Sequence, residues 1–209
     1  MLFQSCDQKK HQQKISAATG SPYTHAAVYL GDNEIAEATP PKIRKRQLSE
    51  SDKEGQVIGV LRSQLGFSGE RPIALREFVE SLIRNGAWYD FRGIRDFNTV
   101  KTKFKEELLN ILERDYGKVT ANDELARRSY FCSALVVACY AAVGLIDGTA
   151  KLAYKAEAFS PADLHEDDTF GWFLGYITAD EKDIPSDDPL MTKTLWRDLQ
   201  DARWWQQGS

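Results

Sequence analysis

Two short segments carry a cysteine and a histidine in the settings that a thiol nucleophile and its base require. Cys132 begins an apolar run, 132–143, that predicts a helix buried on all sides. His25 begins an alternating stretch, 25–30, that predicts a strand. A thiol attacks as the thiolate, which a helix N-terminus and a neighbouring imidazolium both stabilise. The sequence therefore favours a cysteine hydrolase with Cys132 as nucleophile and His25 as base.

A histidine base needs a third group to hold its ring, and Glu37 is the best candidate in this chain. Residues 35–38 predict a strand that forms a hairpin with 25–30. A three-residue loop, 31–33, would pair Leu30 with Glu34 and Ala27 with Glu37. His25 and Glu37 would then be diagonal neighbours on one face, roughly 7–8 Å apart. A two-residue loop would place them on opposite faces.

These residue types also have ordinary structural explanations. A lone cysteine in an apolar helix is usually part of the core, and Cys139 is interpreted in that way. A lone strand histidine is usually structural as well. Spacing alone therefore leaves both the catalytic and the structural interpretation of Cys132 and His25 open.

Composition excludes several classes of function. The chain has 209 residues and a net charge of −4, which gives no reason to expect a nucleic-acid surface. The short basic cluster in 42–46 is followed by acidic residues and is interpreted as a solvated loop. Three cysteines without framework spacing argue against a disulfide scaffold. His11, His25 and His165 lack metal-ligand spacing, so we expect no metal and no cofactor.

No apolar run is long enough to predict a transmembrane segment, and the first ten residues lack the apolar region of a signal peptide. The expectation is synthesis in the cytoplasm.

Periodicity predicts alternating small strands and helices. We expect strands at 2–3, 25–30, 35–38, 57–61 and 172–177, helices at 9–19, 75–84, 101–116 and 132–143, and a polar loop at 42–56. In the third helix, apolar residues at helical spacing are predicted to face inward: Phe104, Leu108, Leu109, Ile111 and Leu112. An acidic tail, 178–209, ends in a possible helix that carries Trp196, Trp204 and Trp205.

Five segments, in this order, resemble the NlpC-type branch of the papain-like cysteine peptidases. They are a lead-in at 17–24, the histidine strand from His25 to Glu37, the Trp88-Tyr89-Asp90-Phe91 segment, the nucleophile helix Phe131-Cys132-Ser133-Ala134-Leu135-Val136, and a late turn, Phe159-Ser160-Pro161-Ala162-Asp163-Leu164. Histidine precedes cysteine, which is similar to the circularly permuted members of the family. The usual Gly-Asp before the first strand is missing, and Ala134 stands where an acidic residue is common.

The resemblance implies an α+β, papain-like fold in which a small antiparallel sheet or half-barrel packs against helices. It implies a catalytic domain at 1–177, with 178–209 as an extension that packs on the domain or serves a partner. It also implies an amide hydrolase, an endopeptidase or amidase, that acts on a peptidoglycan peptide. Delivery to a target-cell periplasm by a type VI secretion-like machine would bring such an antibacterial effector to the wall, and an immunity protein would then be a partner. The alternatives are a lipid deacylase or acyltransferase of the lecithin–retinol acyltransferase type, a thioesterase, and an inactive binding module.

Further site candidates lie near the proposed nucleophile and base. Tyr130 and Tyr23 could line a substrate cleft or pack around the active helix. Asp90 could bind a substrate amine or cap a loop, and the cap is favoured. The backbone N–H of Cys132 is the expected oxyanion donor, and the sequence does not identify a second one. His165 lies in an acidic stretch that solvated charge explains better than a metal.

Overall fold

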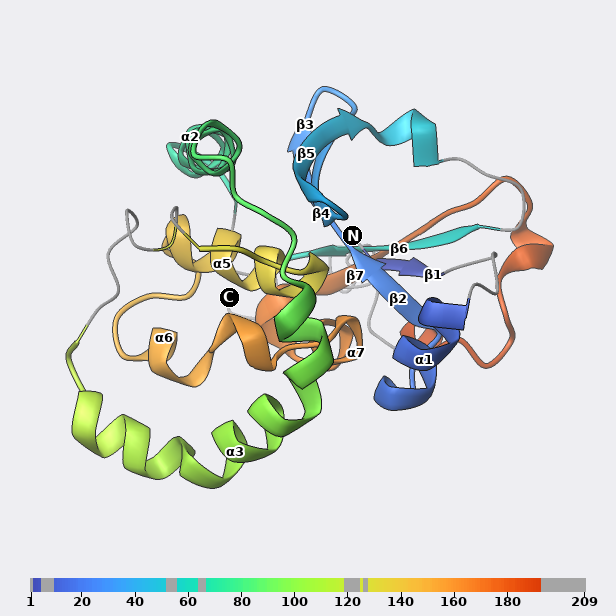
Figure 1. Ribbon diagram of the computed structural model, residues 1–209. Coiled ribbons are helices and arrows are strands. Elements are labelled where there is room, and N and C mark those ends of the chain that lie inside the picture. Colours follow the sequence, from blue (N-terminus) through green and yellow to red (C-terminus); the bar gives the residue numbers. More distant parts are fainter. Residues whose placement is uncertain are drawn as a thin grey trace, which may run out of the picture. The chain divides into compact units, whose positions relative to one another are not determined.

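The computed structural model describes residues 2–4, 10–51, 56–63, 67–118, 125 and 128–192. It divides the chain into two compact units, one of residues 1–25, 49–66 and 161–209, the other of residues 26–48 and 67–160. Short antiparallel sheets are combined with helices, so the fold class is α+β, as the sequence predicts (Figure 1). Within the described part of the chain, no helix has both the length and the apolar character that crossing a bilayer requires.

The first unit is built on a four-stranded sheet in the order β2–β1–β6–β7. Strand β6 lies between β1 and β7 and is antiparallel to both. The predicted strands at 2–3, 57–61 and 172–177 are confirmed. The elements of this unit are β1 (Leu2–Gln4), α1 (Lys10–Thr19), β2 (Tyr23–Ala26), β6 (Val57–Arg62), α7 (Pro161–Glu166), η3 (Asp168–Phe170), β7 (Trp172–Ile177), η4 (Glu181–Asp183) and η5 (Pro189–Thr192).

A buried carboxylate fixes the segment that follows β7. Asp188 is 2 % exposed and accepts hydrogen bonds from the Tyr23 hydroxyl (2.9 Å), the Tyr176 hydroxyl (2.8 Å) and the backbone N–H of Leu190 (2.9 Å). Leu190 is fully buried over Gly59 of β6, where a side-chain carbon would overlap it. Residues 188–190 are therefore packed on the sheet of the first unit. Trp196, Trp204 and Trp205, in the predicted tail helix, lie outside the described residues.

The second unit combines a three-stranded sheet with helices. The sheet order is β3 (Val28–Gly31), β4 (Glu34–Thr39), β5 (Lys42–Gln47). The helices are α2 (Arg71–Arg84), α3 (Phe91–Asp115), α5 (Cys132–Ala142) and α6 (Ala150–Ala153), with short 3₁₀ turns η1 (Leu48–Ser51) at the junction of the units and η2 (Ala156–Ala158). Helix α2 packs against β3 and β5, and α5 packs against β4, α2 and η2 (Figure 1). Nearly every side chain of α5 is buried, which confirms the predicted central helix.

The hairpin loop differs from the predicted one, but the two residue pairs beyond the bulge have the predicted register. Asp32 and Asn33 both adopt positive φ, which makes a two-residue turn of the kind that joins tight hairpins. Gly31 pairs with Glu34, where the prediction had Leu30, and a bulge between Tyr29 and Gly31 absorbs the extra residue. Val28 then pairs with Ala36, and Tyr29 with Ile35, as predicted. The predicted strand 25–30 is also divided into β2 and β3 at Ala27.

Residues 42–47 form a strand, and the predicted loop at 42–56 is wrong for them. Strand β5 pairs antiparallel with β4 along its whole length. The lysines and arginines of this segment led to the loop prediction. Carboxylates on β4 compensate their positive charge, as Glu37 does for Arg44 and Arg46. Ile43, on the opposite face, is 1 % exposed. A strand rich in charge is therefore stable here because its partner strand supplies opposite charge.

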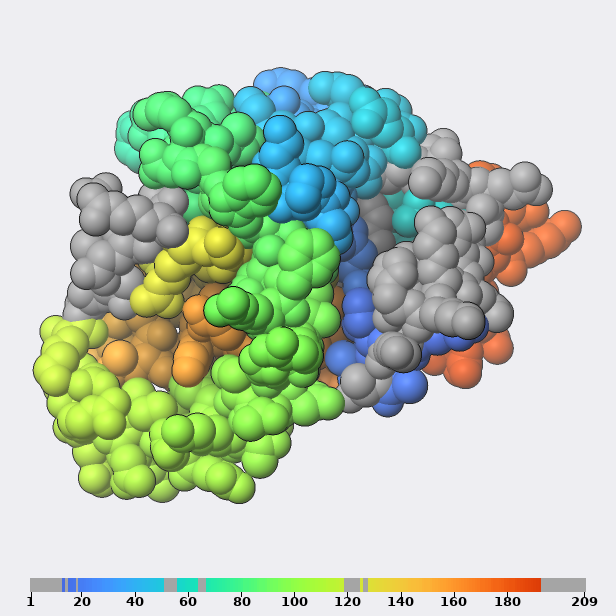
Figure 2. Space-filling model, in the orientation of Figure 1, coloured from blue at the N-terminus to red at the C-terminus, as the bar shows by residue number. Residues whose placement is uncertain are grey.

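Helix α3 begins at Phe91 rather than at the predicted Lys101, and it is largely exposed. Phe104 is its buried side chain among the residues described, whereas Leu109 is 74 % exposed, so the prediction that Leu109 faces inward is wrong. The helix contacts η2 and α6, and its outer side forms a long exposed ridge of the second unit (Figure 2). Helical spacing predicted which apolar residues lie on one face of the helix, but not how much of that face other parts of the chain cover.

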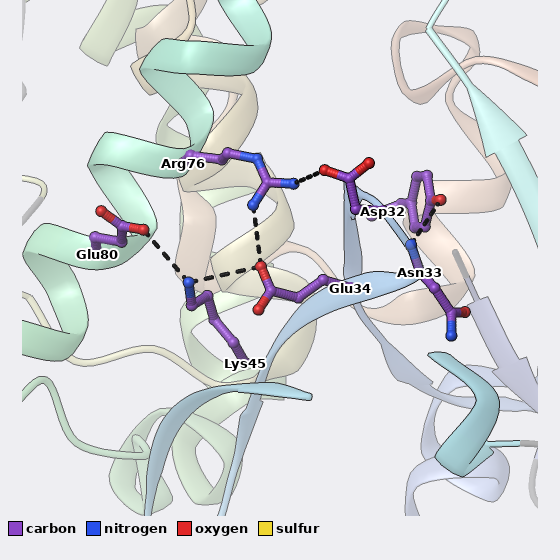
Figure 3. Close-up of polar contacts among 7 residues, drawn as sticks. Asp32, Asn33, Glu34, Lys45, Arg76 and Glu80 are labelled. Carbon is purple, nitrogen blue, oxygen red and sulfur yellow. Dashed lines mark hydrogen bonds and ion pairs between the residues drawn. The ribbon is translucent and has the colours of Figure 1, made fainter. Parts of the chain in front are cut away.

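A partly exposed ion-pair network joins the hairpin to α2 (Figure 3). Arg76 bridges Asp32 and Glu34 at 3.1 Å each, and Lys45 bridges Glu34 at 3.5 Å and Glu80 at 3.3 Å. Such pairs are weak and salt-dependent because water screens them. We expect Arg76→Met to lower the free energy of unfolding by less than about 1 kcal/mol at low salt, and by less still at about 1 M salt. Denaturant titrations at the two salt concentrations test this, and a large, salt-independent loss would contradict it.

Buried tyrosines predict loss of stability at alkaline pH. Burial and the neighbouring Asp188 raise the pKa of Tyr23, and burial raises the pKa of Tyr130 against a smaller opposing effect of Arg128. These phenols stay protonated in the folded chain at a pH where the unfolded chain has lost the protons. The contribution of these phenols to the free energy of unfolding should therefore be constant below about pH 9. Above about pH 10 it should fall by about 1.4 kcal/mol per pH unit for each such phenol.

Unfolding free energies measured between pH 8 and pH 11 test this expectation. Tyr130→Phe keeps the ring and removes one titrating group, so the alkaline slope should become shallower by one phenol. A slope that Tyr130→Phe leaves unchanged would contradict this assignment.

Candidate active site

Cys132 is the first residue of helix α5. Phe131 before it is extended, with φ −90° and ψ 175°, and its carbonyl accepts the first helical hydrogen bond from the N–H of Leu135 at 3.0 Å. The first turn of α5 contains no acidic residue, and the Cys132 thiol is not in a disulfide. The positive end of the helix dipole therefore acts on Cys132, without a carboxylate in that turn to oppose it.

The start of α5 is held by contacts on several sides. The Ser133 hydroxyl donates to the carbonyl of Phe159 at 2.8 Å, which ties the first turn to the segment after η2. The ring of Phe131 meets that of Phe97 of α3 edge-on, with centroids 6.1 Å apart. Cys132 is 6 % exposed. These contacts fix the position of the Cys132 backbone, as a precise nucleophile requires.

Tyr89 is a candidate that the sequence did not single out, because its hydroxyl interacts electrostatically with Cys132. The segment 88–90 runs beside Tyr130, which donates its N–H to the carbonyl of Trp88 at 3.3 Å and accepts from the N–H of Asp90 at 3.2 Å. Burial, followed by the charges of Cys132 and Asp90, raises the pKa of the Tyr89 hydroxyl. The Tyr89 hydroxyl therefore keeps its proton well above neutral pH and stays a hydrogen-bond donor.

Tyr130 and Tyr23 are core residues in this structure. Tyr130 is 1 % exposed, and its hydroxyl donates to the carbonyl of Leu125 at 2.7 Å. Tyr23 is fully buried, and its hydroxyl donates to Asp188. Both side chains have the packing role that the sequence left open beside substrate binding.

Asp90 caps helix α3. Its side chain accepts a hydrogen bond from the N–H of Gly93 at 2.8 Å, the arrangement typical of an N-cap carboxylate. A side-chain carbon at Gly93 would press on the Asp90 carboxylate, so glycine at that position leaves room for the cap. The cap was the favoured interpretation of Asp90, and the cap holds the segment that carries Tyr89.

Glu37 is a buried carboxylate surrounded by arginines. Its side chain is 3 % exposed. Arg44 donates to Oε1 from Nε at 2.9 Å and from Nη2 at 2.8 Å. Arg46 donates from Nε to Oε1 at 2.7 Å and from Nη2 to Oε2 at 3.2 Å. Such charge-assisted bonds favour the ionised carboxylate and hold it in one orientation.

His25, in strand β2, belongs to the first unit, whereas Cys132 and Glu37 belong to the second. Cys132 and Tyr89 both belong to the second unit. The pairing of His25 with Cys132 and Glu37 stays a prediction from the sequence.

His165 is buried in the first unit. It is 6 % exposed, lies 3.3 Å from the Ser21 hydroxyl, and meets the Tyr23 ring edge-on. Over the described ranges, no cluster of three or more histidine, cysteine or acidic residues is arranged to hold a metal ion.

Comparison with known proteins gives one distant relative. The chain is 26 % identical over 142 residues to "Probable lipoprotein peptidase YaeF" of Escherichia coli (strain K12). That alignment covers 62 % of this chain and 50 % of the relative, so the chain spans about half the relative's length. No family model and no solved structure matches, so the papain-like fold and its permutation stay predictions. The likeness to a protein named as a peptidase supports a peptidase-type function and nothing finer.

Proposed function

We propose that this chain is a cysteine hydrolase of the peptidase type, in which Cys132 is the nucleophile, His25 its base and Glu37 the group that orients His25. The observation that carries the proposal is Cys132 at the start of a buried helix, with no acidic residue in its first turn. The distant likeness to a protein named as a probable peptidase supports the same class of reaction.

In the proposed reaction, the Cys132 thiolate attacks the carbonyl carbon of an amide and forms a carbon–sulfur bond. The oxyanion that develops accepts a hydrogen bond from the Cys132 N–H. The His25 imidazolium gives its proton to the leaving nitrogen as the carbon–nitrogen bond breaks. His25 then takes a proton from water, which attacks the thioester and releases the acid and the thiolate.

The proposed substrate is a peptidoglycan peptide, because the motifs around His25 and Cys132 resemble a family that acts on the cell wall. The second candidate is an acyl ester or thioester of a lipid, which the same thiol chemistry would cleave. Two exposed aromatic side chains flank Tyr89 and support the lipid candidate. Trp88 is 65 % exposed and Phe91 is 61 % exposed. An apolar acyl chain could bind such a surface.

Digestion of two substrates by the same protein separates the candidates. Purified peptidoglycan and phospholipid vesicles are each incubated with the wild type, with Cys132→Ala as the blank, and products are identified by mass spectrometry. New peptide ends from peptidoglycan with the wild type alone support the amidase. Fatty-acid release alone supports the lipid deacylase, and equal release by both proteins would contradict Cys132 as nucleophile.

A further inference from the structure

Charge is unevenly distributed along helix α3, the exposed ridge of the second unit (Figure 2). Residues 91–105, the basic half of the helix, contain one acidic residue and five cations: Arg92, Arg95, Lys101, Lys103 and Lys105. Residues 106–115 contain four acidic residues and one cation. The whole chain has a net charge of −4, so the basic half is opposite in sign to the rest. Such segregation indicates a local attraction for anions that the chain as a whole lacks.

Part of this positive charge is not compensated within the helix. Arg95 and Lys103 form ion pairs with acidic residues of α3, at 2.8 Å and 3.9 Å. Arg92 and Lys105 are exposed as well, and neither forms an ion pair with another residue of the described ranges. Exposed pairs such as those of Arg95 and Lys103 are weak in water, so their cations can also attract an anionic surface.

Two aromatic side chains lie at the start of the basic half. Trp88 precedes the helix and Phe91 is its first residue, and more than half of each side chain is exposed. The ring of Tyr89 meets that of Phe91 edge-on, with centroids 5.0 Å apart, and Asp90 caps the helix between them. The two exposed rings are therefore carried on a fixed segment. Aromatic rings next to cations are typical of protein surfaces at the boundary between lipid headgroups and acyl chains.

The outer face of α3 is unlike the face of a helix that binds in a protein groove. Its residues recur at helical spacing, and all are exposed: Phe91, Arg95, Asn98, Thr102, Lys105 and Leu109. Only the first and the last are apolar, whereas a groove-binding helix presents apolar side chains at every turn. A bilayer surface does not need a continuous apolar stripe, because separate aromatic anchors and cations bind it together. Charge and spacing therefore favour a lipid surface over an apolar protein groove.

We propose that the basic half of α3, together with Trp88 and Phe91, is a docking surface for anionic lipid bilayers. The two aromatic rings enter the boundary between headgroups and acyl chains. The exposed cations, Arg92 and Lys105 foremost, attract the lipid phosphates, with their apolar stems along the surface and their charged ends in water. This role concerns where the chain binds, so it does not depend on which bond Cys132 cleaves.

The experiment measures sedimentation of the full chain with phosphatidylcholine vesicles that contain or lack phosphatidylglycerol. The charge variant is Arg92→Glu/Lys105→Glu. Its matched control makes the same change of charge beyond the basic half: Arg114→Glu/Lys118→Glu. The aromatic variant is Trp88→Ala/Phe91→Ala, and its control removes two other exposed apolar side chains: Ile73→Ala/Tyr116→Ala. Thermal unfolding is recorded for each protein, so that a loss of binding is compared only among folded chains.

The wild type should bind the vesicles with phosphatidylglycerol at least about 10-fold more tightly than those without it, and less tightly at about 0.5 M salt than at about 0.1 M. The charge variant should lower the affinity at least about 10-fold, because its reversed charges repel the lipid phosphates. Its control should change the affinity by less than about threefold, since salt screens charges beyond about 10 Å. The aromatic variant should lose about 10-fold, and its control less than about twofold.

Three results would overturn the inference. Equal binding of the wild type to both kinds of vesicle would mean that anionic lipid is not recognised. No binding to either kind would leave an acidic protein as the partner of the cations. An equal loss in the charge variant and its control would mean that total charge, and not this surface, decides binding. If a double variant does not fold, the single variants Lys105→Glu and Phe91→Ala replace it in the same comparison.

Discussion

A Cys132→Ala protein is expected to lose hydrolytic activity by at least about 10³-fold while remaining folded. Alanine removes the sulfur that forms the covalent bond, so the reaction can proceed only by direct attack of water. The side chain is small, and Ala134 shows that the first turn of α5 accommodates alanine. Rates of product release and a thermal unfolding curve measure the two parts of this expectation.

The matched control for this variant is Cys139→Ala in the same helix. Cys139 is 1 % exposed, and burial raises the pKa of its thiol, so it stays a neutral core residue. Its replacement should leave activity within about twofold of the wild type and cost about 1 kcal/mol or somewhat more in stability, as small core deletions do. Activity that survives in Cys132→Ala but not in Cys139→Ala would contradict the assignment.

The largest loss of stability is expected for Asp188→Ala. The change leaves three donors without their acceptor in a buried site: the hydroxyls of Tyr23 and Tyr176 and the N–H of Leu190. An unsatisfied buried polar group costs about 1–3 kcal/mol, so with partial relaxation we expect a loss of about 3–5 kcal/mol. This is a large part of the stability of an ordinary domain. Denaturant-induced unfolding measures the loss.

Two variants test whether the Asp188 contacts are the cause. Asp188→Asn keeps one side-chain oxygen as acceptor and should lose clearly less than the alanine variant. Asp187→Ala removes the same charge from the adjacent, exposed position and should change stability by no more than about 0.5 kcal/mol. An equal loss for Asp187→Ala and Asp188→Ala would contradict a role for the buried hydrogen bonds.

Hydrophobic periodicity and apolar runs in the sequence predicted much of the fold. The apolar run of α5 and the spacing of Leu75, Phe78, Val79 and Leu82 in α2 indicated helices, and the buried residues are the expected ones. Strand β5 was missed because its side chains are charged, and only the partner strand shows that Glu37 offsets those charges. The hairpin turn was missed by one residue, because a bulge compensates for a shorter turn and no local pattern reveals the bulge.

The candidate site was predictable where a residue's type and its place in a predicted helix or strand were enough to indicate a role. Cys132 at a helix start is such a residue, and the structure has it there. Tyr89 and Arg46 are candidates only because of residues distant in sequence. Tyr89 interacts electrostatically with Cys132, and Arg46 donates hydrogen bonds to Glu37. A tyrosine and an arginine are ordinary residues in any sequence, so these two could not be identified before the chain segments were brought together.

The most direct test of the central claim is detection of a covalent acyl-enzyme on Cys132. The wild-type chain is mixed with p-nitrophenyl acetate, nitrophenolate release is followed, and the acetylated residue is located by mass spectrometry after rapid quenching. A cysteine hydrolase predicts a burst of nitrophenolate, acetyl on the Cys132 peptide, and a much slower reaction in His25→Ala. Acetyl found only on other residues, or equal acetylation of Cys132 in the wild type and His25→Ala, would contradict the Cys132–His25 pair.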